Sequence, residues 1–186
     1  MRVLGIDPGS ETTGWGVVEG DARGYAAVDF GTVRANARER FPARLLKIAV
    51  GVEALIEKFR PDVCAVEEAF FAVNPNTALK LGHVRGVVLL AAERAGVEIA
   101  EYAPRLIKQT VVGYGAAEKQ QVQEMMRVLL KLKVAPTPFD ASDALAVAVT
   151  HMHQGVRPHQ EKSKPAPARA KLDALLAANP RRRAPR

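Results

Sequence analysis

The sequence is poor in the residues that mark secreted, membrane-spanning and sugar-binding proteins. Its single cysteine, Cys64, cannot form an internal disulfide, and it lies in an apolar run typical of a buried, unreactive thiol. No apolar stretch approaches the ~18–20 residues of a membrane span. Asp7 interrupts the first apolar residues, where a signal peptide would continue. We therefore expect a protein of the reducing cytoplasm with no membrane partner.

Excess positive charge is missing from most of the chain, although the net charge is +7. Residues 1–153 contain 18 basic and 18 acidic residues, so residues 154–186 supply the whole excess. This last segment is rich in proline and ends near an arginine triplet, a composition typical of disorder. We predict one folded domain over 1–153 and a disordered basic tail over 154–186. The folded part cannot bind nucleic acid through a uniform positive field.

The hydrophobic patterns predict an α/β protein with five strands and five helices. Three strands form an antiparallel meander and two more follow later in the chain: 3–7, 13–19, 25–34, 63–67 and 98–102. Helical periodicity covers 45–59, 74–94, 104–112, 117–132 and 139–153. The helix over 74–94 is apolar on more than one face, which predicts either a central position or a dimer interface.

Four carboxylates occupy places from which they can reach a common point. Asp7 and Glu67 each close an apolar strand, and ligands gather at strand ends in open sheets. Asp140 and Asp143 lie three residues apart at the start of a helix, so they share one face. Four anionic donors without histidine or cysteine favour magnesium or manganese. Two such ions would support phosphodiester hydrolysis.

Each acid also has a plainer interpretation. Asp7 precedes Pro-Gly and could cap a turn. Asp140 or Asp143 could cap a helix or interact with its dipole, and Glu67 could belong to a solvated loop. Paired carboxylates also occur in glycosidases, but the chain has one tryptophan and few aromatics to line a sugar cleft.

Five motifs then occur in a specific order. They are Gly5-Ile6-Asp7-Pro8-Gly9, Val66-Glu67-Glu68-Ala69-Phe70, Ala78-Leu79-Lys80-Leu81-Gly82, Lys108-Gln109-Thr110-Val111-Val112-Gly113 and Asp140-Ala141-Ser142-Asp143-Ala144-Leu145-Ala146. Together they resemble the RuvC family of bacterial Holliday-junction resolvases, from about residue 2 to residue 153. The tail lies outside this resemblance.

The resemblance implies a ribonuclease H-like fold, with a mixed five-stranded sheet flanked by helices, which agrees with the predicted order of strands. It also implies a homodimer that nicks two symmetric strands of a four-way junction, in DNA recombination and repair. It implies that Asp7, Glu67, Asp140 and Asp143 are the catalytic, metal-binding acids of a site that takes two Mg²⁺ ions, with Mn²⁺ as a substitute. Cleavage would leave 5′-phosphate ends. Work with the branch-migration proteins RuvA and RuvB is implied as well.

Three further residues match family positions that contact DNA. Lys108 and Lys119 match lysines near the scissile phosphate, although either could be an ordinary solvated helix lysine. Phe70 matches a phenylalanine after the catalytic strand, where an exposed ring could stack on an unpaired base. The neighbouring Phe71 would then point into the core.

Other hypotheses stay open on sequence alone. Asp7-Pro8-Gly9 also fits the first phosphate loop of sugar kinases and actin-like ATPases, but those proteins need two such domains and this chain is too short. A non-catalytic junction-binding scaffold is the second alternative, which the four intact acids disfavour. His151 and His153 end the last predicted helix and form a weaker candidate metal pair.

Overall fold

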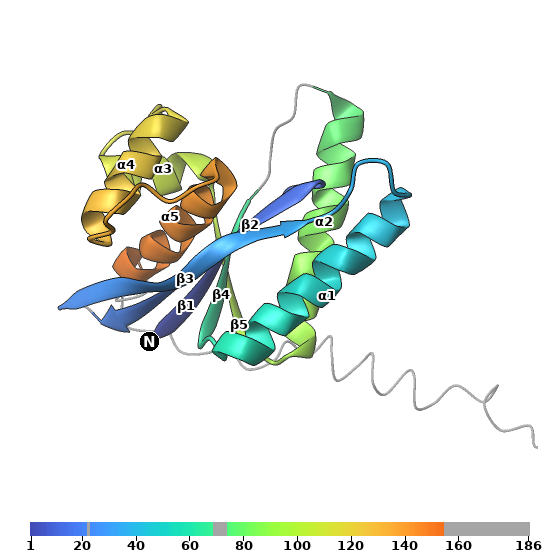
Figure 1. Cartoon of the computed structure of the whole chain (residues 1–186), viewed down its shortest axis with the longest axis horizontal. Coiled ribbons are helices and arrows are strands. Elements are labelled where there is room, and N and C mark those ends of the chain that lie inside the picture. Colours follow the sequence, from blue (N-terminus) through green and yellow to red (C-terminus); the bar gives the residue numbers. More distant parts are fainter. Residues whose placement is uncertain (22, 69–73, 155–186) are drawn as a thin grey trace, which may run out of the picture. The chain divides into compact units, whose positions relative to one another are not determined.

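The computed structural model describes residues 1–21, 23–68 and 74–154, which contain a five-stranded mixed sheet (Figure 1). The strands lie in the order β3-β2-β1-β4-β5. Their bounds are β1 Arg2–Asp7, β2 Thr12–Asp21, β3 Gly24–Arg34, β4 Val63–Glu67 and β5 Glu98–Tyr102. The first three pair antiparallel, while β4 is parallel to β1 and to β5. The predicted meander with added parallel strands is confirmed.

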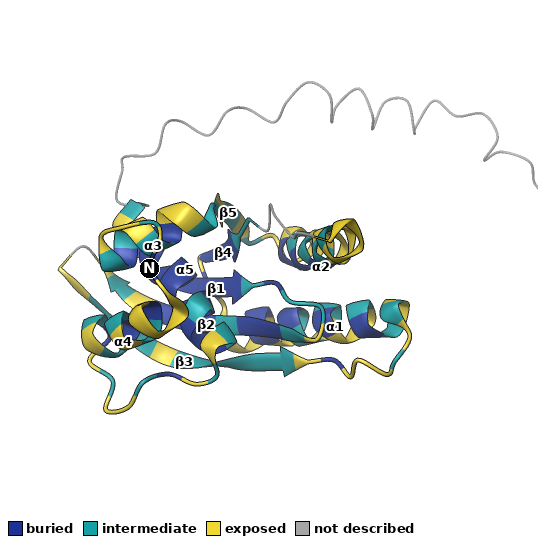
Figure 2. Ribbon diagram, turned by 90° about the horizontal axis from the view of Figure 1, so that it is seen from above, coloured by how far each residue is buried: buried dark blue, intermediate teal, exposed yellow. Residues whose placement is uncertain are grey.

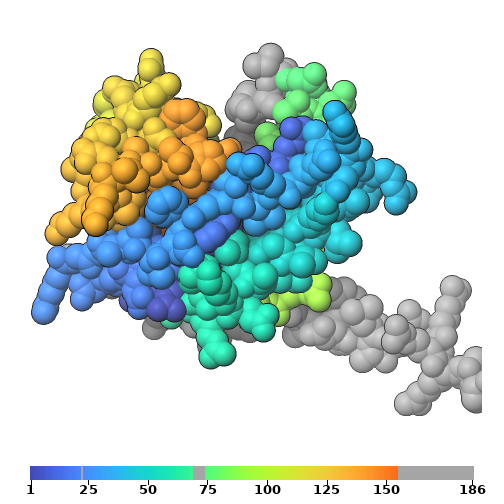
Figure 3. All heavy atoms as spheres, viewed as in Figure 1, coloured from blue at the N-terminus to red at the C-terminus, as the bar shows by residue number. Residues whose placement is uncertain are grey.

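Helices cover both faces of the sheet. They are α1 Phe41–Phe59, α2 Pro75–Arg94, α3 Pro104–Val112, α4 Lys119–Leu129 and α5 Phe139–Gln154. One core lies between the sheet and α3, α4 and α5, and a second lies between the sheet and α1 and α2. The space-filling view shows α4 and α5 on one side of the N-terminal strands and α1 on the other (Figure 3). Each face of the sheet is therefore protected by its own helical layer.

Helix α5 packs directly on the middle of the sheet because two strands carry glycine beneath it. A Cβ atom on Gly5 would lie 2.1 Å from the carbonyl oxygen of Ala144, and one on Gly14 would lie 1.9 Å from that of Asp140. No other residue fits at this separation. Most of α5 is buried as a result (Figure 2). The close approach places the beginning of α5 over the end of β1 and the beginning of β2.

Helix α4 is shorter than the predicted 117–132. It begins after Glu118, whose side chain accepts from the backbone of Gln121 while Gln121 bonds back to the Glu118 backbone. It ends at Leu129, because Lys131 adopts a left-handed φ of 53° that a helix cannot continue through. The periodicity alone could not locate these ends, since apolar residues continue at the helical spacing on both sides.

Helix α2 has one face on the core and another on the surface. Val84 and Val88 are fully buried, whereas Leu79 and Leu90 are 63% and 58% exposed. Figure 2 shows the outer side of α2 as exposed. The helix is thus peripheral, which excludes the predicted central position. Despite this apolar surface, no helix in the described part of the chain is long and apolar enough to cross a membrane.

Candidate active site at the ends of β1 and β4

Asp7 and Glu67 are neighbours because they end two adjacent parallel strands. Ile6 of β1 is paired with Val66 of β4, so the next residue, which is the last of each strand, lies at the same end of the sheet. The charge of Glu67 lies close enough to raise the pKa of the Asp7 carboxyl group. The predicted meeting of these two acids is therefore observed.

Helix α5 brings the other two acids to the same edge. Asp7 is paired across the sheet with Gly14, and the backbone of Asp140 lies against Gly14. Asp143 follows one helical turn later on the same face. The charges of Glu67, Asp140 and Asp143 all act on the carboxyl group of Asp7. Segments separated by more than a hundred residues in the sequence thus deliver four acids to one place.

Burial and mutual repulsion make this group of acids costly to ionise. Burial raises the pKa of Asp7 well above its ordinary value, and the charges of Glu67 and Asp143 raise it further. The pKa of Glu67 is raised to about 7, again by burial first and by Asp143 second. Burial also raises the pKa of Asp143. Raised pKa values of this kind, caused by burial and by like charges, are common among acids of functional sites.

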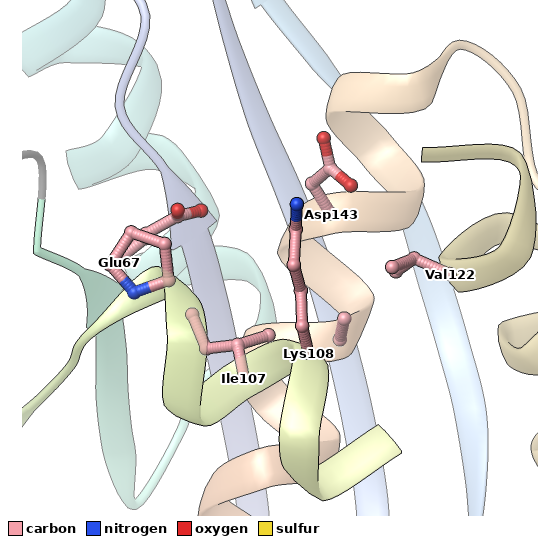
Figure 4. Close-up of a pocket in the computed structure, with 7 residues that line it drawn as sticks. Glu67, Ile107, Lys108, Val122 and Asp143 are labelled. Atoms are coloured by element: carbon pink, nitrogen blue, oxygen red, sulfur yellow. The ribbon is translucent and has the colours of Figure 1, made fainter. Parts of the chain in front are cut away.

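Two lysines stand among the acids and oppose these shifts. Lys119 Nζ lies 3.0 Å from Asp143 Oδ2. That hydrogen bond raises the pKa of Lys119, although burial alone would lower it. Figure 4 shows the Lys108 amino group between the carboxyl groups of Glu67 and Asp143, beside the apolar side chains of Ile107 and Val122. Both predicted lysines therefore lie beside the acids, Lys108 in the lining of the cavity and Lys119 in an ion pair with Asp143 on a side chain that is 59% exposed.

The donor set fits hard divalent cations. All four acids offer oxygen atoms, and their repulsion shows a deficit of positive charge that Lys108 and Lys119 relieve only in part. Among the described residues, no three histidine, cysteine or acidic side chains stand close enough to ligate one ion together. Lys119 instead holds Asp143 by an ion pair. The acids gather in one site, but their side chains are not in a ligating arrangement.

The two candidate metal-binding histidines lie elsewhere, at the opposite end of α5. His151 Nδ1 is 2.7 Å from the hydroxyl group of Tyr102, and His153 Nε2 is 2.7 Å from that of Tyr25. Neither belongs to a metal-binding group of the described residues. Hydrogen bonding to tyrosine explains both.

Other residues near the site were not identified from sequence. In the sequence, Gly14 is an ordinary glycine within a predicted strand, and only the tertiary structure shows its close approach to Asp140. Arg44 holds the loop after Asp7 and had no sequence signal, because an arginine early in a helix is ordinary. The predicted DNA contact Phe70 and its neighbour Phe71 lie outside the described residues.

Comparisons with known proteins agree with this arrangement. The family profile "Crossover junction endodeoxyribonuclease RuvC" matches residues 3–151. A protein of that name from Chloroflexus aggregans is 51% identical over 153 residues, which cover 82% of this chain and 93% of the relative. One from Syntrophomonas wolfei is 47% identical, covering 82% of this chain and 89% of the relative. The solved structure described as T. thermophilus RuvC in complex with Holliday junction substrate has a TM-score of 0.78 and 39% identity, covering 83% of this chain and 94% of that one.

Proposed function

The chain belongs to the RuvC family of crossover junction endodeoxyribonucleases, and from this premise we propose that it resolves four-way DNA junctions by paired symmetric nicks. The observation that carries the proposal is the convergence of four acids at the ends of β1 and β4 and the beginning of α5. The 39% identical Thermus thermophilus protein was solved with a Holliday junction substrate. The same substrate class is assigned to this chain.

The acids Asp7, Glu67, Asp140 and Asp143 would hold two Mg²⁺ ions, for which Mn²⁺ would substitute. When bound, such ions activate a water molecule and stabilise the departing oxygen in phosphodiester hydrolysis. The acids contribute by orienting their oxygens from rigid elements, two at strand ends and two on a buried helix. The products would carry 5′-phosphate and 3′-hydroxyl ends.

The two site lysines have a separate role in this proposal. Lys119 lies 3.0 Å from Asp143, and Lys108 lines the cavity between Glu67 and Asp143. Their ammonium groups would hold the scissile phosphate close to the acids and offset the negative charge that grows on it during hydrolysis. Without such cations, the acidic site would repel DNA. Phe70 remains a proposed stacking contact.

A homodimer would provide the two sites that paired nicks require. Support comes from the outer face of α2, where a groove is lined by apolar residues that include the exposed Leu79 and Leu90. An apolar face of this kind is typical of an interface. Measurement of the molar mass in solution tests the dimer directly.

The remaining partners follow from the family. RuvA and RuvB are proposed as branch-migration partners in the cytoplasm. The tail, residues 154–186, carries nine of the basic residues and two of the acidic ones. Its cations would add sequence-independent affinity for DNA, so that deleting it makes the salt dependence of junction binding shallower. An unchanged slope would remove this role of the tail.

The decisive experiment is cleavage of a synthetic mobile four-way junction with the cut sites mapped to the nucleotide. We expect paired nicks at symmetric positions with Mg²⁺, binding without cleavage in Ca²⁺, and no cleavage after chelation. Because the chemistry of the ends is part of the proposal, the products should be ligatable without prior phosphorylation. Binding without any metal-dependent nicking would instead identify a junction-binding scaffold.

A further inference from the structure

We propose that Arg44 is a positioning residue for strand cleavage, which fixes the loop that follows Asp7. The inference rests on the proposed role of Asp7 as an active-site acid. Arg44 belongs to the first turn of α1, and it reaches across to the loop between β1 and β2. Nothing in the motif that contains Asp7 points to it, because it lies 37 residues further along the chain.

The guanidinium group of Arg44 donates twice to one backbone oxygen. Nε donates to the carbonyl oxygen of Ser10 at 2.9 Å, and Nη2 donates to the same oxygen. The ring of Phe41 lies against the guanidinium group, 5.7 Å from its centre. The side chain is only 8% exposed. Because two donors of one planar, rigid group converge on this oxygen, the Ser10 carbonyl is held in a fixed position relative to the guanidinium plane.

The whole loop after Asp7 is held through successive carbonyl groups. Thr13 Oγ1 donates to the carbonyl of Gly9 at 2.9 Å, Arg44 donates to that of Ser10, and the backbone of Ala35 donates to that of Glu11 at 2.8 Å. Of these three donors, only Arg44 comes from a helix. Arg44 thereby connects the loop after Asp7 to helix α1. Without its side chain, the Ser10 carbonyl would lose its hydrogen bonds to that helix.

Stability alone does not account for a buried arginine here. Its nearest carboxylate, Glu11 Oε1, is 3.8 Å away on a side chain that is 62% exposed, so the cation is poorly compensated. Burying a charge with a weak partner is costly, and an apolar residue of similar volume would fill the space at less cost. What an apolar residue cannot do is hold the Ser10 carbonyl. The geometry therefore points to control of the Asp7 loop.

The test compares single-turnover nicking by wild type, Arg44→Lys and Arg44→Ala at saturating Mg²⁺, with junction affinity measured in Ca²⁺. Lysine keeps the charge but loses the paired donation, and we expect its nicking rate to fall about 10-fold. Alanine should lose roughly 100-fold, the scale that misplacement by an ångström produces. Junction affinity should be unchanged in both. Added guanidinium ion should restore part of the Arg44→Ala rate and none of the rate of an Asp7→Asn variant.

Two controls separate the loop anchor from charge and from folding. Glu11→Gln removes the weak ion pair but leaves the Ser10 carbonyl bonded, so its rate should stay close to wild type. Arg94→Ala removes an exposed arginine that pairs with Glu53 at 3.5 Å, and it should change neither rate nor affinity. If Arg44→Ala does not fold, as judged by circular dichroism, Arg44→Lys carries the test.

The outcomes are distinct from those of the proposed function. If wild type does not nick the junction, the proposed function fails first. If wild type nicks and Arg44→Lys nicks equally fast, the positioning role is wrong. A loss in Glu11→Gln as large as that in Arg44→Lys would also overturn it, because the charge pair would then be the important contact. A fall in junction affinity that accounts for the lost rate would make Arg44 a DNA-binding residue instead.

Discussion

The two ends of helix α5 show opposite ways of burying ionisable groups. At its beginning, Asp143 lies in a group of acids that raise one another's pKa, with Lys119 as the counter-charge. At its other end, burial lowers the pKa of His151, which stays neutral and bonds to the hydroxyl group of Tyr102. At its beginning, the negative charge of the acids is only partly neutralised by lysine. Near its other end, the buried histidine is hydrogen-bonded to a tyrosine hydroxyl group.

This contrast separates a reactive site from structural polar groups. A buried acid that repels its neighbours costs stability, and that cost is offset when a cation binds. A buried neutral imidazole with a hydroxyl partner satisfies its hydrogen bonding without any ligand. The same helix therefore carries mutually repelling acids at its beginning and a tyrosine-bonded histidine near its end. The four predictions below test this difference, from the largest expected effect to the smallest.

Asp7→Asn should have the largest effect, because it removes the charge on which the other three acids act. We expect no detectable nicking in Mg²⁺, junction binding in Ca²⁺ close to that of wild type, and a higher melting temperature for the metal-free protein. The rise follows because a buried, repelled charge is lost. Nicking on a four-way junction and thermal melting in chelator measure the two effects. Full nicking by this variant would remove Asp7 from the catalytic role.

Gly14→Ala should break the site through packing rather than charge. Its Cβ would lie 1.9 Å from the carbonyl oxygen of Asp140, so α5 must move away from β2. We expect a loss of roughly 1–3 kcal/mol in the free energy of unfolding, together with slower nicking. Gly24→Ala is the matched control, because a Cβ there meets nothing within 4 Å. Equal denaturation midpoints for the two variants would contradict the close packing.

The third prediction concerns the pH dependence of stability that Glu67 causes. Because the pKa of Glu67 is raised to about 7 from an ordinary 4.5, the folded protein prefers the protonated acid. The stability that the folded protein gains by keeping Glu67 protonated is fully present below about pH 4.5 and is lost as the pH rises through 7. In chelator, Glu67→Gln should therefore melt higher than wild type at pH 8, and the difference should shrink as the pH falls and disappear below about pH 4.5. In wild type at pH 8, added Mg²⁺ should raise the melting temperature.

His151 should show a smaller effect of the opposite sign. Burial lowers its pKa below the ordinary 6.5, so the folded protein prefers the neutral ring. Its contribution is present above about pH 6.5 and is lost as the pH falls toward the folded-state pKa. His151→Asn keeps a partner for Tyr102 but does not titrate, so it should lose less stability than wild type between pH 7 and 5. Nicking at pH 8 should be unchanged. A steeper acid loss in the variant would show that His151 is charged in the fold.

Much of the fold could be read from local patterns. The bounds of α3 and the ends of β4 and β5 agree with the predicted ranges, because proline, strand ends and changes of period mark them locally. The ends of α4 were wrong by two or three residues, since the capping interaction of Glu118 with Gln121 and the left-handed Lys131 interrupt a longer apolar pattern. The spacing of apolar residues indicates which residues of a helix face the core, but it does not indicate at which residue the helix begins or ends.

For the site, the sequence by itself determined the candidate acids, since strand-terminal and helix-terminal carboxylates mark their own positions, and the family motifs added the two lysines. Only the tertiary structure decided that these groups meet, because the meeting depends on the parallel pairing of β1 with β4 and on glycines that let α5 approach the sheet. It also decided that His151 and His153 are structural, since their tyrosine partners lie on β5 and β3. The periodicity of a sequence describes each element separately, whereas charge repulsion and close contact arise only between elements.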